Sequence, residues 1–482
     1  MECDVRKLLF IIALGIFSPL SLALELSPLS NEPYTGDLDK LKKTGVVRVL
    51  VSADLGFYYI EGGKPKGIVA EMLYHFEKNL KKTHRTMNVQ IIPVQRDDLL
   101  PSLNAGYGDI AVANLTITKP RLKKVDFSDP MIKNNQELII TSSNQDSISS
   151  LEQLSGKEIW VRASSSYFES LQLINQNLNA KGLPPVFVHF IEETLQDYEL
   201  IEMVNQGYIS GTVLDSHKAN LWLNVMDNIK VHDDFPLREG GEIAWALRKD
   251  SPQLKKEINN YIKKARTGTL LGNVIYNKYI NDTRWLSRAL DPKKIERLAR
   301  LTEIFEHYSS EYEFDHLMMS AQGFQESGLD QSKVSHRGAI GVMQVLPSTA
   351  KDKNVNIKNI HKVDNNIHAG IKYMRFIKSR YFDNPEISPD DQIYFTLAAY
   401  NAGPAKIRKM RNLAKKKGYN PNVWFKNVEI VTRQHVSSEP VKYVANINRY
   451  YVIYKQLATI QSMRDEGNAQ LTPVESISID QF

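Results

Sequence analysis

The C-terminal half of the chain contains QESG at Gln325–Gly328, GVMQ at Gly341–Gln344 and AYNAG at Ala399–Gly403. Apolar residues at three- and four-residue steps lead into the first stretch and predict a helix that Gly328 ends. Glu326 is then expected on the last turn of that helix. The negative end of the helix dipole and partial burial both favour a protonated carboxyl there, and a general acid that works near neutral pH needs such a carboxyl.

The pattern is helical with short loops from the capped start at Asp291 and Pro292 onward, which predicts a mainly α domain. In their order and spacing, the three stretches resemble the SLT-type, lysozyme-like lytic transglycosylase domain. That family cleaves the β-1,4 bond between N-acetylmuramic acid and N-acetylglucosamine in peptidoglycan without water, and leaves a 1,6-anhydro ring. The resemblance implies that Glu326 alone is the catalytic acid and base.

The same resemblance implies substrate-binding residues near Glu326: Ser327, Met343, Gln344, Tyr400, Asn401, Glu439 and Tyr443. Taken singly, Met343 and Tyr400 are more often core residues than site residues. The last family segment departs from the pattern, because Pro440 stands where the family has threonine.

The N-terminal half alternates between strand and helix patterns. Val46–Ser52 is β-branched and apolar, and a helical pattern follows over about Val69–Leu80. The alternation continues to about residue 250, so we expect an α/β domain with a mainly parallel sheet.

Five segments of this half carry a second resemblance: Gly108–Ile110, Asn114–Arg121, Val125–Pro130, Ala244–Asp250 and Asn277–Tyr279. They resemble the extracellular solute-binding proteins of the polar amino acid type, which have two lobes and a ligand cleft between them. The resemblance implies that Arg121 and Thr116 hold a ligand carboxylate and that Asp215 takes a ligand ammonium. A surface or inter-lobe ion pair is the alternative for Arg121 and Asp215, and Phe57–Tyr59 are as consistent with core as with ligand stacking.

The N-terminus has the features of an export signal. Arg6 and Lys7 precede an apolar run over Leu8–Leu22, and small residues follow, so residues 1–23 are predicted to be a secretory signal. An uncleaved anchor is the alternative. The single cysteine, Cys3, precedes the apolar run and allows no internal disulfide.

Composition narrows the classes of function. The 482 residues are 42% hydrophobic and can bury two or three cores. Residues 1–282 hold 32 Lys+Arg against 34 Asp+Glu, and residues 283–482 hold 29 against 21, so the positive balance lies in the C-terminal part. In an exported protein, that surface is expected to meet anionic cell wall or headgroups rather than nucleic acid, and a solvated face such as Lys415–Lys417 is the alternative. No metal spacing, phosphate loop or nucleophile elbow occurs, so we expect no cofactor and no metal.

Nearly the whole mature chain resembles the membrane-bound lytic murein transglycosylase F family. We expect a two-lobed, periplasmic-binding-protein-like α/β domain over 46–282, a lysozyme-like transglycosylase domain over 283–463 that begins with a short join at Thr283–Leu286, and a polar, flexible tail over 464–482. The resemblance implies a periplasmic enzyme, peripheral on the outer membrane, with an N-terminal domain that binds a small amino-acid-like or muropeptide ligand. The alternatives are a catalytically silent, wall-anchored ligand sensor and a muramidase that uses water.

Overall fold

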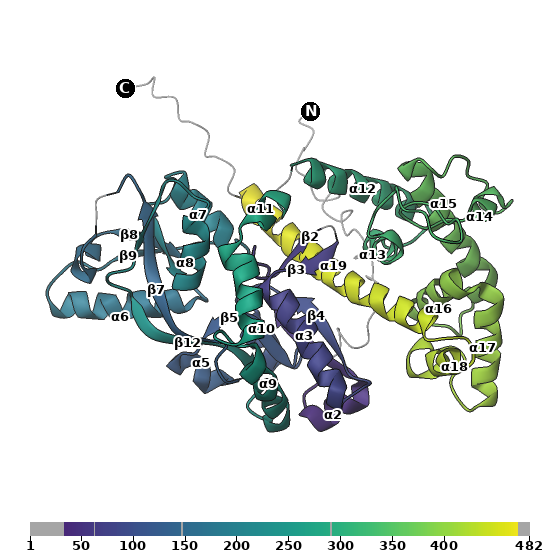
Figure 1. Ribbon diagram of the computed structural model, residues 1–482, viewed down its shortest axis with the longest axis horizontal. Helices are drawn as coiled ribbons and strands as arrows, with labels where there is room; N and C mark the ends of the chain where they lie inside the picture. The colour runs from purple at the N-terminus through teal and green to yellow at the C-terminus, as the bar shows by residue number, and fades with distance from the viewer. Residues whose placement is uncertain (1–32, 62, 146–147, 290–291, 471–482) are drawn as a thin grey trace, which may run out of the picture. The chain divides into compact units, whose positions relative to one another are not determined.

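The structure is a computed structural model that describes residues 33–61, 63–145, 148–289 and 292–470. It divides into two compact units (Figure 1). Of the described residues, those within 33–310, 314–330 and 449–470 form the larger unit, and residues 311–313 and 331–448 form the helical unit. The signal predicted for residues 1–23 lies outside the described residues.

A ten-stranded sheet runs through the larger unit in the order β4-β1-β5-β12-β7-β10-β8-β9, with β6 paired to β12 and β11 paired to β7. Its strands are β1 (Val46–Val51), β4 (Asn88–Pro93), β5 (Ile110–Thr116), β6 (Asp126–Phe127), β7 (Ile132–Ser142), β8 (Glu158–Val161), β9 (Phe187–Phe190), β10 (Gly211–Asp215), β11 (Ile229–His232) and β12 (Arg238–Leu247). We call the β4-β1-β5 end the first lobe and the β10-β8-β9 end the second lobe.

The sheet is mixed, and the prediction of a mainly parallel sheet was wrong. Strand β1 is parallel to β4 and β5, and β8 is parallel to β9 and β10. Strand β12 is antiparallel to both β5 and β7, and β7 is antiparallel to β10 and β11. Strands β11 and β12 follow one another along β7 in the same direction, with residues 233–237 between them, and β12 then continues antiparallel to β5.

Helices cover the sheet (Figure 1). They are α2 (Leu38–Thr44), α3 (Ile68–Thr83), α4 (Leu99–Asn104), α5 (Lys119–Lys124), the 3₁₀ turn η2 (Leu151–Leu154), α6 (Ser166–Ala180), α7 (Asp197–Asn205), α8 (Ser216–Leu223), α9 (Pro252–Ala265), α10 (Leu270–Tyr276) and the π turn η3 (Asn277–Asn281). Helix α3 buries one apolar stripe, as its sequence pattern predicts. A separate hairpin joins β2 (Tyr59–Glu61) to β3 (Lys64–Lys66).

The segment after the α/β domain is also helical. The expected join at Thr283–Leu286 lies mostly within α11 (Arg284–Ala289), and α12 (Pro292–Glu311) and α13 (His316–Ser327) follow. Most of α12, all of α13 and the last part of α19 (Glu439–Gln470) group with the larger unit. Helix α19 continues past Arg464, where the tail was expected to begin.

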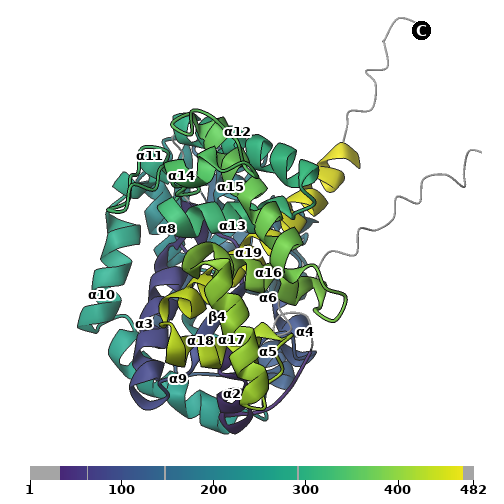
Figure 2. The same ribbon diagram turned by 90° about the vertical axis from the view of Figure 1, so that its right-hand side faces the viewer.

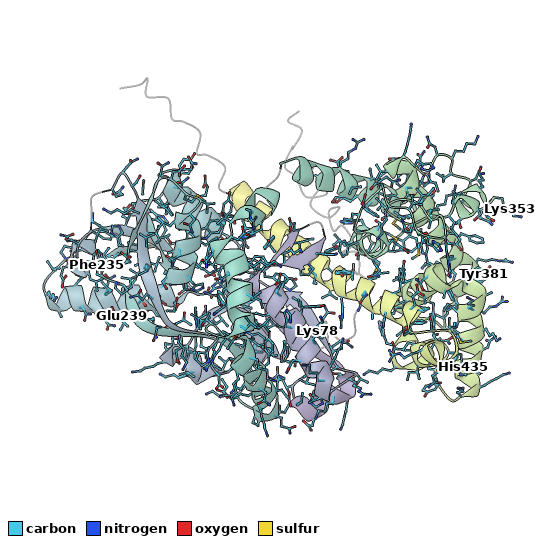
Figure 3. The ribbon with its side chains drawn as sticks, in the orientation of Figure 1. Lys78, Phe235, Glu239, Lys353, Tyr381 and His435 are labelled. Carbon is cyan, nitrogen blue, oxygen red and sulfur yellow. The ribbon has the colours of Figure 1, made fainter. Side chains whose placement is uncertain are left out.

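The helical unit is built around one buried helix (Figure 2). Its elements are α14 (Pro347–Lys351), α15 (Val363–Ile377), the π turn η4 (Lys378–Phe382), α16 (Pro389–Ala402), α17 (Pro404–Lys416), the π turn η5 (Trp424–Val428), α18 (Glu429–His435) and the start of α19. Residues 392–399 of α16 are all buried, so this helix has neighbours on every side. Lys353, which follows α14, lies exposed at the edge of the unit (Figure 3). Within the described residues, no helix combines the length and the apolar character that a membrane span requires.

Candidate functional site

Helix α13 carries Glu326 on its last turn, as the sequence predicts. Asp315 caps the start of the helix by accepting from the backbone N–H of Leu317 at 2.8 Å, and the Tyr451 hydroxyl donates to the other oxygen of Asp315. Gly328 ends the helix in the left-handed conformation (φ 73°), with its N–H donating to the carbonyl of Phe324. Glu326 is partly buried. The cap at Asp315 and the turn at Gly328 fix both ends of the helix that carries it.

Phe324 holds α13 against the β2–β3 hairpin. At Gly63, which has φ +79°, an added Cβ would lie 2.4 Å from the Phe324 ring. The Tyr450 ring packs edge-on against Phe324 at 4.7 Å between centroids. The helix that carries Glu326 therefore packs on the hairpin at a distance that only glycine allows.

The Ser327 hydroxyl forms hydrogen bonds with backbone groups around the end of α13. It donates to the carbonyl of Gly323 at 3.2 Å and accepts from the N–H of Asp330 at 3.0 Å. Ser327 is 8% exposed. These contacts assign Ser327 a part in shaping the turn that follows Glu326.

In the helical unit, a tight turn carries Met343 and Gln344. Gln344 has φ 47°, and its side-chain amide donates to the carbonyls of Gly341 and Lys333. The Met343 side chain is fully buried against Gly370, which favours the core alternative for its side chain. Its backbone N–H donates to the amide oxygen of Asn366 at 2.8 Å.

Asn366, on α15, holds this turn by hydrogen bonds, and the sequence analysis did not identify it. Its side chain is fully buried on α15, and its amide nitrogen donates to the carbonyls of Ile340 and Ile360. No residue of α15 was among the predicted site residues. A buried asparagine on an otherwise apolar helix face was the available signal, because a buried amide must find partners.

Tyr400 and Asn401 lie at the end of α16, and Tyr400 joins this end to the turn. The Tyr400 hydroxyl donates to the carbonyl of Met343 at 2.8 Å, and its ring packs on Tyr373. The structure thus brings together the GVMQ and AYNAG stretches. Glu439 is exposed on the first turn of α19, and Tyr443, one turn later, is 5% exposed.

The three residues expected to bind a ligand lie in the larger unit and are engaged by their own chain. Arg121 donates to the carbonyls of Thr116 at 2.9 Å and Ser164 at 3.0 Å, and Thr116 is 1% exposed. Burial, and then the charge of Arg96, lower the pKa of Arg121 to about 10. The guanidinium therefore remains charged at neutral pH.

Asp215 is also engaged by residues of its own chain. Its carboxylate is 1% exposed and accepts from the amides of Asn135 at 2.5 Å and Asn114 at 2.6 Å and from the Tyr167 hydroxyl at 2.9 Å. Asn114 is in the first lobe and Tyr167 in the second. The lobes thus meet through side chains at the position where the resemblance expects a ligand.

A small cavity of about 20 Å³ is lined by residues of both lobes: Ser52, Ala53, Asp54, Val94, Gln95, Arg96, Arg162, Glu193, Thr194, Leu195, Gln196 and Asp197. Such a volume holds about one water molecule. The lobes are closed onto each other in this structure, because Asn114 of the first lobe bonds Asp215 of the second at 2.6 Å and Arg121 bonds the Ser164 carbonyl at 3.0 Å.

Comparison with known proteins matches both halves to families. Residues 47–282 match the bacterial extracellular solute-binding proteins, family 3, and residues 303–423 match the transglycosylase SLT domain. The second match includes Glu326, Gln344 and Tyr400 and ends before Glu439. An ancestral arginine-binding protein bound to arginine is 26% identical, with a TM-score of 0.40 over 49% of this chain and 98% of that chain.

Curated relatives match this chain over most of its length. A Desulfosudis oleivorans protein named membrane-bound lytic murein transglycosylase F is 30% identical over 439 residues, which are 86% of this chain and 91% of that protein. A Pseudomonas fluorescens protein of the same name is 27% identical over 97% of this chain and 95% of its own length. The chain therefore belongs to the membrane-bound lytic murein transglycosylase F family.

Proposed function

We propose that this protein is a peptidoglycan lytic transglycosylase with Glu326 as its single catalytic carboxyl. It cleaves the β-1,4 bond between N-acetylmuramic acid and N-acetylglucosamine and leaves 1,6-anhydromuramic ends. The observation that carries the proposal is Glu326 on the capped last turn of α13, within a chain that matches the SLT domain. The family membership supports a location at the cell envelope, and we propose the periplasm, with peripheral attachment to the outer membrane.

The proposed chemistry uses one carboxyl twice. Protonated Glu326 gives its proton to the glycosidic oxygen as the bond breaks, and the resulting carboxylate takes the proton of the muramyl 6-hydroxyl as that oxygen closes the anhydro ring. No water enters the balance, and the carboxyl returns to its starting state. Gln344, Tyr400 and Asn401 hold the sugars, with Ser327, Met343, Glu439 and Tyr443 as the further substrate-binding residues.

We also propose that the family 3 domain binds a small amino-acid-like or muropeptide ligand. Arg121 and Thr116 lie together and Asp215 lies across the same closed cleft, which supports a ligand between the lobes. Their present partners show that a ligand must replace internal hydrogen bonds to reach them.

The test is mass spectrometry of purified peptidoglycan after incubation with the mature protein or with Glu326→Gln. We expect anhydromuropeptides from the unmodified protein and a loss of about 10²–10⁴-fold in their release by the variant. Glu303→Gln makes the same change at an exposed glutamate of α12 and should release products normally.

Each other outcome selects an alternative. Products heavier by one water would mean a muramidase that uses water. Binding to the wall with no products from either protein would mean a ligand sensor anchored to the wall.

A further inference from the structure

Lys218 is a fully buried lysine, and no sequence motif predicted its burial. It lies on the first turn of α8 and is 1% exposed. Its Nζ donates to Asp54 Oδ2 at 2.5 Å and to Asp197 Oδ2 at 2.5 Å, and lies 4.5 Å from the centre of the Phe57 ring. Lysine is almost never buried to this extent unless it is paired, so these acceptors account for its position.

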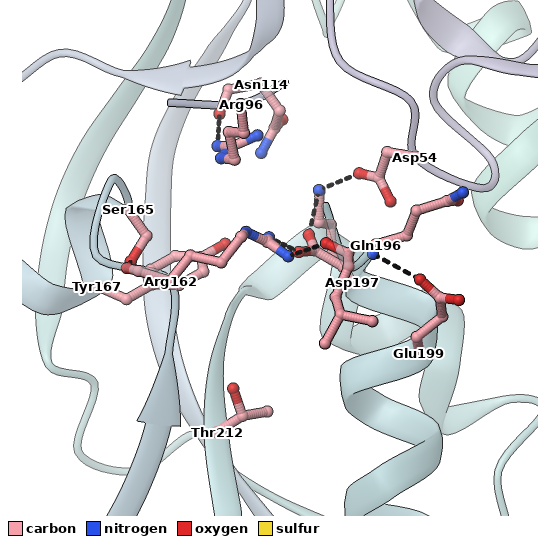
Figure 4. A network of polar contacts seen from close by, with 12 residues as sticks. Asp54, Arg96, Asn114, Arg162, Ser165, Tyr167, Gln196, Asp197, Glu199 and Thr212 are labelled. Atoms are coloured by element: carbon pink, nitrogen blue, oxygen red, sulfur yellow. Dashed lines mark hydrogen bonds and ion pairs between the residues drawn. The ribbon is translucent and has the colours of Figure 1, made fainter. Parts of the chain in front are cut away.

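The acceptors come from both lobes. Asp54 follows β1 in the first lobe, and Asp197 begins α7 in the second lobe (Figure 4). Lys218, on α8, follows β10 in the second lobe. The loop of Asp54 is fixed by two backbone hydrogen bonds with Tyr58, both 2.8 Å long. The hydrogen bond from Lys218 to Asp54 therefore joins the two lobes, and its acceptor lies in a loop whose backbone is held in place.

The charges in direct contact balance. Arg162 pairs with Asp197 and also donates to the carbonyl of Leu195 at 2.7 Å. Two carboxylates thus face one guanidinium and one ammonium. Both carboxylate oxygens of Asp197 accept a hydrogen bond, one from Arg162 and one from Lys218. A further cation could therefore bind Asp197 only by replacing one of them.

This arrangement is what a binding site for a primary ammonium contains: two carboxylate acceptors, an aromatic face and little access to water. The ammonium that occupies it belongs to the chain itself. The cavity beside it is lined by Asp54, Arg162 and Asp197 themselves.

We propose that Lys218 is a tethered ligand whose ammonium fills an alkylammonium site between the lobes and closes them without a free ligand. An amino acid can use Asp54 and Asp197 only by displacing Lys218, so the domain rejects free cationic amino acids at this site. The proposal deepens the proposed ligand-binding role of the family 3 domain by naming what competes with the ligand.

The test is chemical rescue in the full mature chain. Lys218→Ala removes the side chain beyond Cβ and leaves two carboxylates against one guanidinium, so we expect the melting temperature to fall by about 10 °C. n-Propylammonium replaces the missing atoms, from Cγ to Nζ. It should raise the melting temperature of the variant saturably and bind in calorimetry, with no effect on the unmodified protein.

Matched controls separate charge from volume. 1-Propanol fills the same space without a charge and should not rescue. Lys78→Ala removes an exposed lysine that also lies over an aromatic ring, that of Tyr74 at 4.3 Å, and should show neither loss nor rescue. Adding Asp54→Asn to Lys218→Ala should weaken n-propylammonium binding at least tenfold.

Three results would overturn the proposal: equal rescue by 1-propanol, no saturable effect of n-propylammonium, or equally tight binding by the unmodified protein. If Lys218→Ala does not fold, it should fold when produced with n-propylammonium and fail with 1-propanol, and failure with both would also reject the idea. The readouts are binding and stability, not glycan release, so they remain distinct from the test of Glu326.

Discussion

Gly341 shows how a single backbone position fixes the turn that carries Gln344. It has φ +77°, and an added Cβ would lie 2.5 Å from the Gln331 side chain and 2.7 Å from the side-chain amide of Asn366. The Asn366 amide in turn bonds the backbone on both sides of the glycine. The glycine is therefore required both by its conformation and by the buried amide packed against it.

Gly341→Ala should destabilise the protein by roughly 2–4 kcal/mol, because conformational strain and a clash with a buried amide act together. Glycan cleavage should fall with it, since Gln344 moves with the turn. Gly338→Ala is a matched control, because Gly338 has φ +78° but no atom within 4 Å of an added Cβ. Urea unfolding of both variants measures the difference, and equal losses would show that the contact with Asn366 is unimportant.

The positions of some functional residues can be predicted from the sequence, and those of others cannot. Glu326 and Gly328 belong to one local pattern, and a helix end can be read from a few neighbouring residues. Lys218, by contrast, meets Asp54 across 164 positions of the chain and Asp197 across 21. No local pattern encodes such a meeting, so the buried ammonium and the closed cleft appear only in the folded chain.

At the scale of elements, amphipathic helices were predictable and strand direction was not. The apolar stripe of α3 predicts its position because a helix buries residues at a fixed period. Strand β12 is apolar over its buried half, but its antiparallel direction is set by its pairing with β5 and β7, which are distant from it in the sequence. Helix α19 likewise continues past Arg464 to Gln470, which the polar sequence of this segment did not predict.

Helix α19 is attached to α3 by a salt bridge whose strength depends on pH. Arg449 lies 3.2 Å from Glu77, which also accepts from Lys81 and from the backbone N–H of Val89. Burial raises the pKa of Glu77, but the charge of Arg449 and these hydrogen bonds outweigh it, so the pKa lies below its ordinary 4.5. The stabilisation is therefore complete above pH 4.5 and is lost as the pH falls through the lowered pKa.

Glu77→Gln should cost about 1 kcal/mol at pH 7, a value reduced for the partial exposure of the pair. The difference from the unmodified protein should shrink as the pH falls below 4.5. Arg449→Gln should give a loss of similar size, while Glu303→Gln, at an exposed position, should change little. Urea unfolding across pH 3–7 checks this expectation, and a difference that does not depend on pH would assign the effect to packing instead.

At the scale of the whole molecule, charge is divided sharply between segments. Residues 331–448 hold 20 Lys+Arg against 8 Asp+Glu, a net charge of +12, while the rest of the chain holds 41 against 47, a net charge of −6. Helix α17 and its cap contribute seven of these cations and no acid. Lys415, Lys416 and Lys417 are all exposed at its end.

This division predicts that the helical unit drives binding to peptidoglycan, whose peptide stems carry carboxylates. Changing Lys415, Lys416 and Lys417 together to Gln should weaken binding to purified sacculi severalfold at low salt, because three exposed cations leave one face. The same change at Lys40, Lys42 and Lys43, which are exposed on α2 in the larger unit, should have little effect. Near 1 M NaCl the Debye length falls to about 3 Å, so both variants should then bind like the unmodified protein. Equal losses from both triple variants at low salt would show that net charge alone governs binding, whereas a loss confined to α17 locates the contact on the unit that carries Gln344 and Tyr400.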